Sequence, residues 1–338
     1  MPDTVNLAWT LAARPDGAPK PSDFELQESA IPEPGSGQVV IATHYHSLDP
    51  YMRGRMNPPN PASYAAPVEI GDVMEGEAVG EVIASNSDRL AVGDFAMARI
   101  GWQEYGVIDA HAARKIDPSP APISTSLGIL GMPGLTAYFG LFEIGKPVAG
   151  DTVVVTAASG AVGAVVGQLA KINGCRVIGL AGSDEKVDYV VNELGFDVGI
   201  NYKTEDVSAR FNELCPAAIN VYWDSVGGPV TDAAVNHIAI GGRAVICGQI
   251  ALYNATSAPQ GPRNIPRMLL TRQARMEGFL VFQFKDRYAA GLARLTNWVR
   301  DGSLKYKEDV VEGIENSPSA FIGLLNGANF GKLVVKVR

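Results

Sequence analysis

The pattern of hydrophobic and polar positions changes once along the chain, near residue 127. Up to about residue 125, short alternating runs are broken by Gly and Pro, as expected of a mostly β domain. The clearest runs cover 37–48, 75–84, 93–99 and 103–109. Beyond residue 127, buried-type strands alternate with amphipathic segments of helix length, which predicts a parallel sheet with crossover helices.

Six strands can be followed through this second region. They are TVVVT (152–156), RVIGLA (176–181), VGIN (198–201), INVYWD (219–224), GRAVICG (242–248) and RMEGFLVF (275–282). A long helix through Trp298 follows, and KLVVKVR (332–338) is expected to be a strand that pairs back with the N-terminal β domain. We therefore predict an α/β fold with a Rossmann doubly wound parallel sheet in residues 127–298. Residues 1–126 and 299–338 are expected to form a β-rich domain.

Composition and charge narrow the class of protein. The 338 residues are 46% hydrophobic and 19% charged, which is typical of an ordinary soluble globular protein. The net charge is −8, and the basic residues form no block, which argues against nucleic-acid and membrane partners. No window approaches 18 uninterrupted apolar residues and the N-terminus does not resemble a signal peptide, so a cytoplasmic location is expected. Cys175, Cys215 and Cys247 are expected to be buried free thiols.

The segment TAASGAVGAVVGQLAK (156–171) has the pattern of a dinucleotide-binding loop that opens a helix. Aligned to the G-x-G-x-x-G fingerprint, residues 158–163 read A-S-G-A-V-G, so alanine replaces the first glycine. Gly160 and Gly163 remain, and these let the backbone approach a pyrophosphate and let the helix pack on the strand. Free N–H groups at the helix N-terminus favour phosphates. A purely structural turn is the alternative, which the surrounding strand and helix repeats disfavour.

The end of the second strand bears on the choice between NAD and NADP. An NAD site usually places Asp or Glu there to bind the ribose hydroxyls, whereas this strand ends in Leu-Ala-Gly-Ser at 180–183. Lys186 and the hydroxyl of Tyr202 could instead contact a 2′-phosphate, with Ser183 as a helper. The alternative for Lys186 is a solvated helix lysine.

Nine short sequence motifs, spread along nearly the whole chain, can be compared with known protein families. They are DPYMRGRM (49–56), GMPGLTAYFGL (131–141), TAASGAVGAVVGQLAK (156–171), GSDEK (182–186), NYKT (201–204), DSVGG (224–228), CGQIALYN (247–254), RMEGFLVF (275–282) and NFGKLVV (329–335). Together they resemble the zinc-independent medium-chain dehydrogenase/reductases, in the branch of prostaglandin reductases, alkenal double-bond reductases and curcumin reductases. The resemblance implies a Rossmann domain with a GroES-like β-rich catalytic domain, a cleft between them, NADP(H) as cofactor and a homodimer.

The resemblance also implies which residues contact the cofactor. It places Ala161, Val162, Gly163 and Ala164 on the pyrophosphate and Lys186 and Tyr202 on the 2′-phosphate. It places Ser225 near the cofactor, and these residues near the nicotinamide half: Cys247, Gly248, Ile250, Tyr253, Phe279, Leu280, Val281 and Asn329. Relatives commonly carry Asn at the position of Ser225 and often Ser at that of Ala251. At Ser225 the polar side chain near the cofactor is shorter than in relatives, and at Ala251 a possible hydroxyl contact is missing.

A metal is not expected at this site. The chain has no CxxC cluster and no cysteine before residue 175. Only His44 and His46, two residues apart on a strand, suggest a ligand pair, and no third ligand is near in sequence. Reduction of a C=C bond conjugated to a carbonyl needs a Lewis acid less than carbonyl reduction does, because hydrogen-bond donors can stabilise an enolate.

The predicted reaction is the NADPH-dependent reduction of α,β-unsaturated ketones or aldehydes by hydride transfer to the β-carbon. By resemblance, Tyr253 is the first candidate for the group that hydrogen-bonds the enolate, and Tyr51 is the second. Either Tyr253 or solvent protonates the α-carbon. The alternatives are an NADPH quinone reductase and a catalytically idle NADPH-binding protein. The sequence leaves the physiological enone or enal substrate open.

Overall fold

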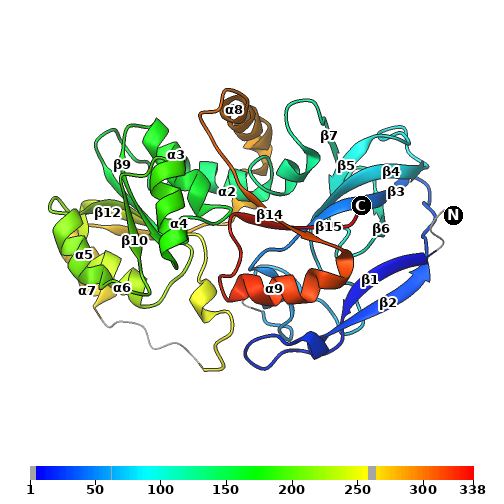
Figure 1. Ribbon diagram of the computed structural model, residues 1–338, viewed down its shortest axis with the longest axis horizontal. Coiled ribbons are helices and arrows are strands. Elements are labelled where there is room, and N and C mark those ends of the chain that lie inside the picture. The colour runs from blue at the N-terminus through cyan, green and yellow to red at the C-terminus, as the bar shows by residue number, and fades with distance from the viewer. Residues whose placement is uncertain (1–4, 62, 258–263) are drawn as a thin grey trace. The chain divides into compact units, whose positions relative to one another are not determined.

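The computed structural model describes residues 5–61, 63–257 and 264–338. The chain divides into two compact units, each of which has most of its residue contacts within itself (Figure 1). Met1–Leu127 and Glu308–Arg338 form one, here called the β-rich unit. Gly128–Lys307 forms the other, here called the parallel-sheet unit.

Within the described residues, the sheet of the parallel-sheet unit has six parallel strands in the order β10-β9-β8-β11-β12-β13. The strands are β8 (Thr152–Val155), β9 (Arg176–Ala181), β10 (Val198–Asn201), β11 (Ile219–Asp224), β12 (Ile238–Ile246) and β13 (Arg275–Gly278). All residues of β8 are buried, because a central parallel strand is covered on both faces. The predicted α/β class with a doubly wound sheet is confirmed.

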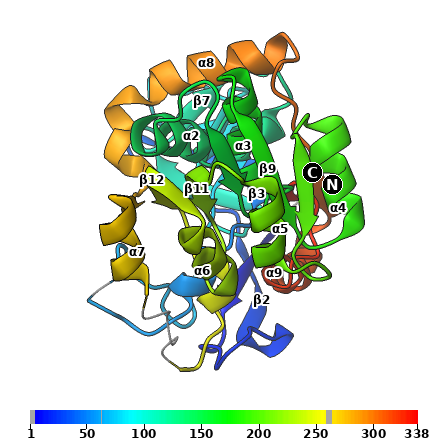
Figure 2. The ribbon, with the colours of Figure 1, turned by 90° about the vertical axis from the view of Figure 1, so that its left-hand side faces the viewer.

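Helices cover both faces of this sheet. They are α2 (Met132–Phe139), α3 (Gly163–Ile172), α4 (Asp184–Asp188), α5 (Val207–Leu214), α6 (Pro229–Asn236), α7 (Ile265–Arg272) and α8 (Tyr288–Arg300). On one face, α5, α6 and α7 lie side by side (Figures 1 and 2), and Phe211 and Ala234 join the strand residue Ile178 in one buried cluster. Gly179, the next residue of β9, points to the other face, where α3 packs.

Helix α4 is continued directly by a π-helical turn at Tyr189–Glu193. One expected element ends earlier than the sequence pattern indicated. The strand expected over 275–282 stops at Gly278. At Phe279 the chain leaves the sheet, and the phenyl ring packs against Trp223 with 5.9 Å between ring centres.

The β-rich unit is built on a second sheet with the order β14-β15-β3-β4-β5-β7, in which β6 also pairs with β3, and on a separate β1-β2 hairpin. Its strands are β1 (Val5–Leu11), β2 (Phe24–Ala30), β3 (Gln38–Ser47), β4 (Ala78–Ser85), β5 (Phe95–Ala98), β6 (Tyr105–Asp109), β7 (Arg114–Ile116), β14 (Glu308–Glu312) and β15 (Lys332–Lys336). Its helices are α1 (Met52–Arg55) and α9 (Ser317–Leu325). As predicted, the C-terminal strand pairs back with this unit, since β15 runs antiparallel to β3.

The core of the β-rich unit gathers around Trp102. Its ring centre lies 5.4 Å from that of Phe321 in α9 and 5.8 Å from that of Phe24. Met52 and Met56, at the two ends of α1, are fully buried in the same cluster. This packing fixes the short helix that follows Tyr51.

Residues 299–307 belong with the parallel-sheet unit, whereas the sequence placed them with the β-rich domain. The buried amide side chain of Gln168 in α3 explains the difference. Its Nε2 donates to the carbonyl of Lys305 at 2.9 Å, and its Oε1 accepts from the N–H of Lys305 at 2.8 Å. Leu304 is buried beside them, and the Lys307 ammonium lies 5.4 Å from the ring centre of Tyr189.

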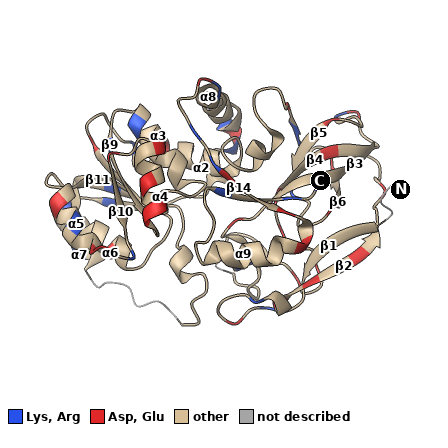
Figure 3. Ribbon diagram, viewed as in Figure 1, with Lys and Arg blue, Asp and Glu red and all other residues tan. Residues whose placement is uncertain are grey.

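Acidic and basic residues are dispersed along both units (Figure 3). Among the helices of the described residues, none is long and apolar enough to cross a membrane.

Candidate active site

The loop between β8 and α3 is shaped by close backbone approaches. A Cβ atom added at Gly163 would stand less than 3.0 Å from the carbonyl oxygen of Ala157, so only glycine fits there without a shift. At Gly160 the same oxygen would lie 3.2 Å away. Ala157 itself has a φ of 48°, a left-handed conformation that is uncommon for alanine. The two glycines therefore let the loop fold tightly over the end of β8.

The alanine that replaces the first fingerprint glycine is compensated from the neighbouring strand. Ala158 is fully buried, and its N–H donates to the carbonyl of Leu180 at 2.9 Å. A Cβ atom on Gly179 would lie 2.9 Å from the Cβ of Ala158. The space that Ala158 occupies is thus left free by a glycine on β9, and the loop keeps its place.

The N-terminus of α3 offers backbone donors to an anion. Helix α3 begins at Gly163, and its first intrahelical bonds run from the N–H groups of Val165 and Val166 to the carbonyl of Val162 at 3.1 and 3.0 Å. The N–H of Ala164 already donates to the carbonyl of Gly160 at 3.0 Å, so the donors that the described contacts leave for a ligand are the N–H groups of Val162 and Gly163 at the start of the helix. Together with the helix dipole, they suit the pyrophosphate of a dinucleotide.

The ends of β9 and β10 form a polar corner. A Cβ atom on Gly182 would lie 2.9 Å from the hydroxyl of Tyr202 and 3.3 Å from Cε of Lys203. Lys186 is half-buried in the first turn of α4. Sequence reasoning selected Lys186 and Tyr202 but missed Lys203, although it stands beside Tyr202 in the NYKT segment.

One acid near this corner, Asp184, is already engaged. Asp184 accepts a hydrogen bond from Nδ2 of buried Asn201 at 2.7 Å. Ser183 caps α4, and its hydroxyl oxygen accepts from the N–H of Lys186 at 3.3 Å. Asp184 therefore ties α4 to β10, and the cations of the corner, half-buried Lys186 and exposed Lys203, suit a phosphate.

The end of β11 is held by the buried carboxylate of Asp224. It accepts from the N–H groups of Val226 and Gly227 at 2.9 and 2.8 Å and from the hydroxyl of Thr231 at 2.6 Å. Ser225 follows, and its hydroxyl oxygen accepts from Trp223 Nε1 at 3.1 Å. The serine that replaces the usual asparagine is thus tied to the indole beneath it.

The segment after β12 approaches the same place. The N–H groups of Cys247 and Gly248 donate to the carbonyl of Asp224 at 2.8 and 3.1 Å, and that of Ile250 donates to the carbonyl of Ser225 at 3.3 Å. A Cβ atom on Gly248 would lie 3.4 Å from the hydroxyl of Tyr253. The structure therefore brings the Tyr253 hydroxyl close to the ends of β11 and β12.

Cys247 does not have the properties of a nucleophile. Burial raises the pKa of its thiol to about 12, against a smaller lowering effect of the Ser225 hydroxyl. Burial also raises the pKa values of Cys175 and Cys215. All three are free thiols, as expected, but only Cys175 and Cys215 are buried residues, whereas Cys247 is half-buried. With these raised pKa values the thiols remain protonated at neutral pH.

The remaining expected cofactor residues of this unit follow β13. The Phe279 side chain is buried against Trp223, and an added Cβ on Gly140 would meet both rings at less than 3.0 Å. Leu280 and Val281 are half-buried where a 3₁₀ helix, Val281–Arg287, begins. The Phe279 ring is thus engaged in packing within the parallel-sheet unit.

In the β-rich unit, Tyr51 stands directly before α1. Burial raises the pKa of its phenol well above the ordinary value, with further raising by the carboxylates of Asp49, Glu75 and Glu77. The phenol therefore stays protonated and can donate a hydrogen bond. The Arg55 guanidinium lies 5.7 Å from its ring centre.

Asn329 also lies in the β-rich unit, just before β15. It is half-buried, and its Nδ2 donates to the carbonyl of Gly331 at 2.9 Å. The described contacts thus group Ser225, Gly248 and Tyr253 in the parallel-sheet unit, and place Tyr51 and Asn329 in the other.

The two histidines considered as metal ligands have separate surroundings. His46 is fully buried, its Nε2 lies 2.9 Å from the hydroxyl of Ser317, and burial lowers its pKa to about 3. The His44 ring meets Phe95 edge-on at 5.6 Å. Over the described ranges, no group of three or more His, Cys, Asp or Glu side chains could hold a metal ion.

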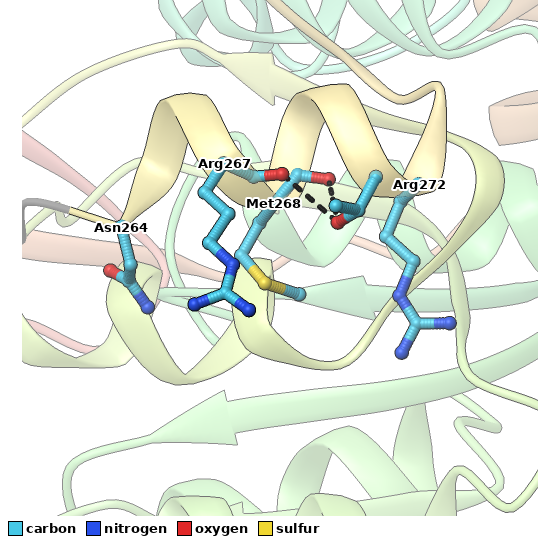
Figure 4. A pocket seen from close by; sticks show the side chains of 5 residues that line it. Asn264, Arg267, Met268 and Arg272 are labelled. Carbon is cyan, nitrogen blue, oxygen red and sulfur yellow. Dashed lines mark hydrogen bonds between the residues drawn. The ribbon is translucent and has the colours of Figure 1, made fainter.

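A cavity of about 420 Å³ lies elsewhere on the parallel-sheet unit, along α7. Figure 4 shows Asn264, Arg267, Met268 and Arg272 lining it, with Thr271 bonded back to the helix backbone. None of the expected site residues lines this cavity, so we do not identify it with the active site.

The fold and the loop geometry define a dinucleotide-binding oxidoreductase, and comparisons with known proteins specify its family. Two family models match, described as the N-terminal domain of oxidoreductase over residues 8–116 and zinc-binding dehydrogenase over residues 161–297. The chain belongs to the medium-chain dehydrogenase/reductase family, as the sequence indicated. The zinc in the name of the second model has no counterpart in a ligand cluster among the residues described above.

Relatives match nearly end to end. The NADPH-dependent curcumin reductase of Escherichia coli is 43% identical over 98% of this chain and 97% of its own length. Prostaglandin reductase 1 of Rattus norvegicus is 41% identical over 97% and 98%. The NADP(+)-dependent 2-alkenal reductase of Nicotiana tabacum is 42% identical over 95% and 94%.

A solved structure agrees with the fold of the whole chain. CurA from Vibrio vulnificus, determined in complex with NADPH, is 44% identical and superposes with a TM-score of 0.93 over 98% of this chain and 99% of its own.

Proposed function

We propose that this protein is an NADPH-dependent reductase of the C=C bond of α,β-unsaturated ketones and aldehydes. The observation that carries the proposal is the identity of 41–43% along nearly the whole chain to enzymes named for curcumin, prostaglandin and 2-alkenal reduction. The match covers both units, so it includes residues on the substrate side as well as those on the cofactor side.

NADP(H) is the cofactor, and the geometry of the parallel-sheet unit fits it. Gly160, Ala161, Val162, Gly163 and Ala164 would hold the pyrophosphate, because the close approach at Gly163 leaves the helix N-terminus open to it. Lys186 and Tyr202 would hold the 2′-phosphate. To these we add Lys203, whose side chain reaches the same corner beside Gly182.

The nicotinamide half is assigned to two groups of residues. Ser225, Cys247, Gly248, Ile250 and Tyr253 belong to the segments that meet at Asp224. The backbone of Phe279, Leu280 and Val281 and the side chain of Asn329 complete the set.

Bound NADPH supplies the hydride that adds to the β-carbon of the enone. As that bond forms, the π electrons of the C=C bond move toward the carbonyl, and negative charge develops on the carbonyl oxygen. The Tyr253 hydroxyl donates a hydrogen bond to this oxygen and lowers the barrier electrostatically. Tyr51 is the second donor, since its phenol stays protonated. A proton from Tyr253 or from solvent then completes the saturated product at the α-carbon.

The test is a set of parallel assays on the purified protein. NADPH absorbance should fall on addition of a simple enone such as 3-penten-2-one and stay constant with the saturated ketone 2-pentanone. Turnover of quinones at rates exceeding those of enones by orders of magnitude would favour the quinone reductase. Tight NADPH binding without turnover of any electrophile would identify an idle binding protein.

We further propose that the protein acts as a homodimer in the cytoplasm. Strand β13 forms one edge of the described sheet, and an exposed edge can pair with a second copy. Free cysteines support a reducing compartment. Light scattering during size-exclusion chromatography should give twice the chain mass of 35.7 kDa, and a mass of one chain would contradict the dimer.

A further inference from the structure

Lys332, at the start of β15, is the one buried lysine among the described residues, with 4% of its surface exposed. Its ammonium donates to the Ser47 hydroxyl at 2.7 Å, to the Leu48 carbonyl at 2.9 Å and to the Asp49 carboxylate at 3.0 Å. An ammonium has three N–H donors, and here each has an acceptor. These acceptors belong to three consecutive residues.

The same network sets the turn that carries Tyr51. The second carboxylate oxygen of Asp49 accepts from the Ser47 hydroxyl. The Asp49 carbonyl accepts from the N–H of Met52 at 3.1 Å, and α1 begins there. Tyr51 lies inside this turn, two residues after the carboxylate that Lys332 binds.

Stability alone does not explain such a pair. Burying two charges costs about as much free energy as their attraction returns, so apolar side chains of similar size often serve as well. A buried pair does, however, fix position, because its hydrogen bonds allow little variation in geometry. Lys332 also follows the Asn329–Gly331 segment directly, so one side chain links that segment to the Tyr51 turn.

We propose that Lys332 is a positioning residue for the reaction, which acts by holding the Tyr51 turn in register with the segment that carries Asn329. This inference rests on the proposed function, and it assigns to Lys332 no contact with substrate or cofactor. Lys332 affects turnover only through Tyr51.

A double-mutant cycle tests this coupling. Lys332→Met, which keeps an unbranched side chain but removes the ammonium group, should lower kcat for an enone by about tenfold or more, because a small misplacement of a reacting group costs that much. Tyr51→Phe should lower kcat as well. In Tyr51→Phe/Lys332→Met, the second change should have no further effect on kcat, whereas a general loss of structure would multiply the two losses.

A readout without turnover accompanies the cycle. In Lys332→Met, hydrogen exchange at residues 50–55 should speed up, because the turn loses its anchor. Lys336→Met is the matched control, since Lys336 lies on the same strand in an exposed pair with Glu312 at 3.2 Å. It should leave kcat and this exchange unchanged.

A further variant covers the risk that the single change unfolds the protein by leaving Asp49 unpaired. Asp49→Asn/Lys332→Met removes both charges and should recover the thermal midpoint but not kcat. The proposal is overturned if this variant turns over like the wild type, if the losses multiply in the cycle, or if Tyr51→Phe has wild-type kcat. Failure of the wild type to reduce any enone would instead contradict the proposed function, and the exchange experiment would still test the anchor.

Discussion

At the residue scale, the cofactor loop depends on where Cβ atoms can and cannot be placed. The sequence predicted roles for Gly160 and Gly163 from the fingerprint alone, and the structure supplies the reason in the nearby carbonyl of Ala157. The sequence could not predict how Ala158 is accommodated. That depends on Gly179, which is 21 positions away in sequence and adjacent only across the β8 and β9 strands.

Gly163→Ala tests the close approach. The added methyl group would push the loop away from Ala157, so we expect NADPH affinity to fall and the free energy of unfolding to drop by about 1–3 kcal/mol. Isothermal titration and thermal denaturation measure the two effects. Gly323→Ala in α9 is the control, because its added Cβ would meet only Ala328 at 3.6 Å. Equal behaviour of the two variants would contradict the packing argument.

Lys186→Ala and Lys203→Ala test the 2′-phosphate corner. Each should weaken NADPH binding by about tenfold, since a hydrogen bond to a charged group is worth about 1.5–3 kcal/mol. NADH binding should stay the same, because NADH lacks the 2′-phosphate. Lys171→Ala, which removes an exposed pair with Asp197 at 2.8 Å, should change neither affinity. If NADPH and NADH binding were weakened equally, Lys186 and Lys203 would not contact the 2′-phosphate.

Buried His46 should make folding sensitive to acid. Its pKa falls from 6.5 to about 3 on folding, so the unfolded chain binds more protons between these values. The contribution to stability is complete above pH 6.5 and is lost as pH falls toward 3, by about 1.4 kcal/mol per pH unit. In denaturant titrations, His46→Gln should flatten this slope relative to wild type. An unchanged slope would contradict a neutral, buried His46.

At the element scale, periodicity predicted the parallel sheet well, because its strands are continuous buried runs such as TVVV in β8. Periodicity did not predict the strand β14, which lies at an exposed edge of the second sheet. β14, with the sequence EDVVE, carries mostly exposed and half-buried residues, and nothing in its pattern separates it from a loop. Its pairing with β15 is a long-range contact that local pattern does not encode.

The segment before β14 gives a test at the same scale. Gln168→Leu removes both hydrogen bonds to the Lys305 backbone, so the free energy of unfolding should fall by about 2 kcal/mol. Backbone hydrogen exchange at residues 301–307 should speed up, while exchange in the helices of the parallel-sheet unit should stay the same. Gln27→Leu, on exposed β2, should have neither effect. If the Gln168 variant behaves like this control, residues 299–307 are held by other contacts.

At the scale of the whole molecule, the sequence identified a two-domain oxidoreductase because its motifs are spread over nearly the full length of the chain. The structure adds the unit boundaries and the local geometry of the candidate site residues within each unit. The roles of Tyr253 and Tyr51 depend on a substrate as well as on the chain, so they stay predictions.

The central claim is that the protein uses NADPH to reduce conjugated C=C bonds. The most direct test follows deuterium from NADPH that carries deuterium at both C4 positions into the product of 3-penten-2-one, read by mass spectrometry and NMR. We predict one deuterium at the β-carbon of 2-pentanone, with the carbonyl intact. Deuterium on the carbinol carbon of an unsaturated alcohol, or oxidation of NADPH without a labelled ketone, would contradict the account.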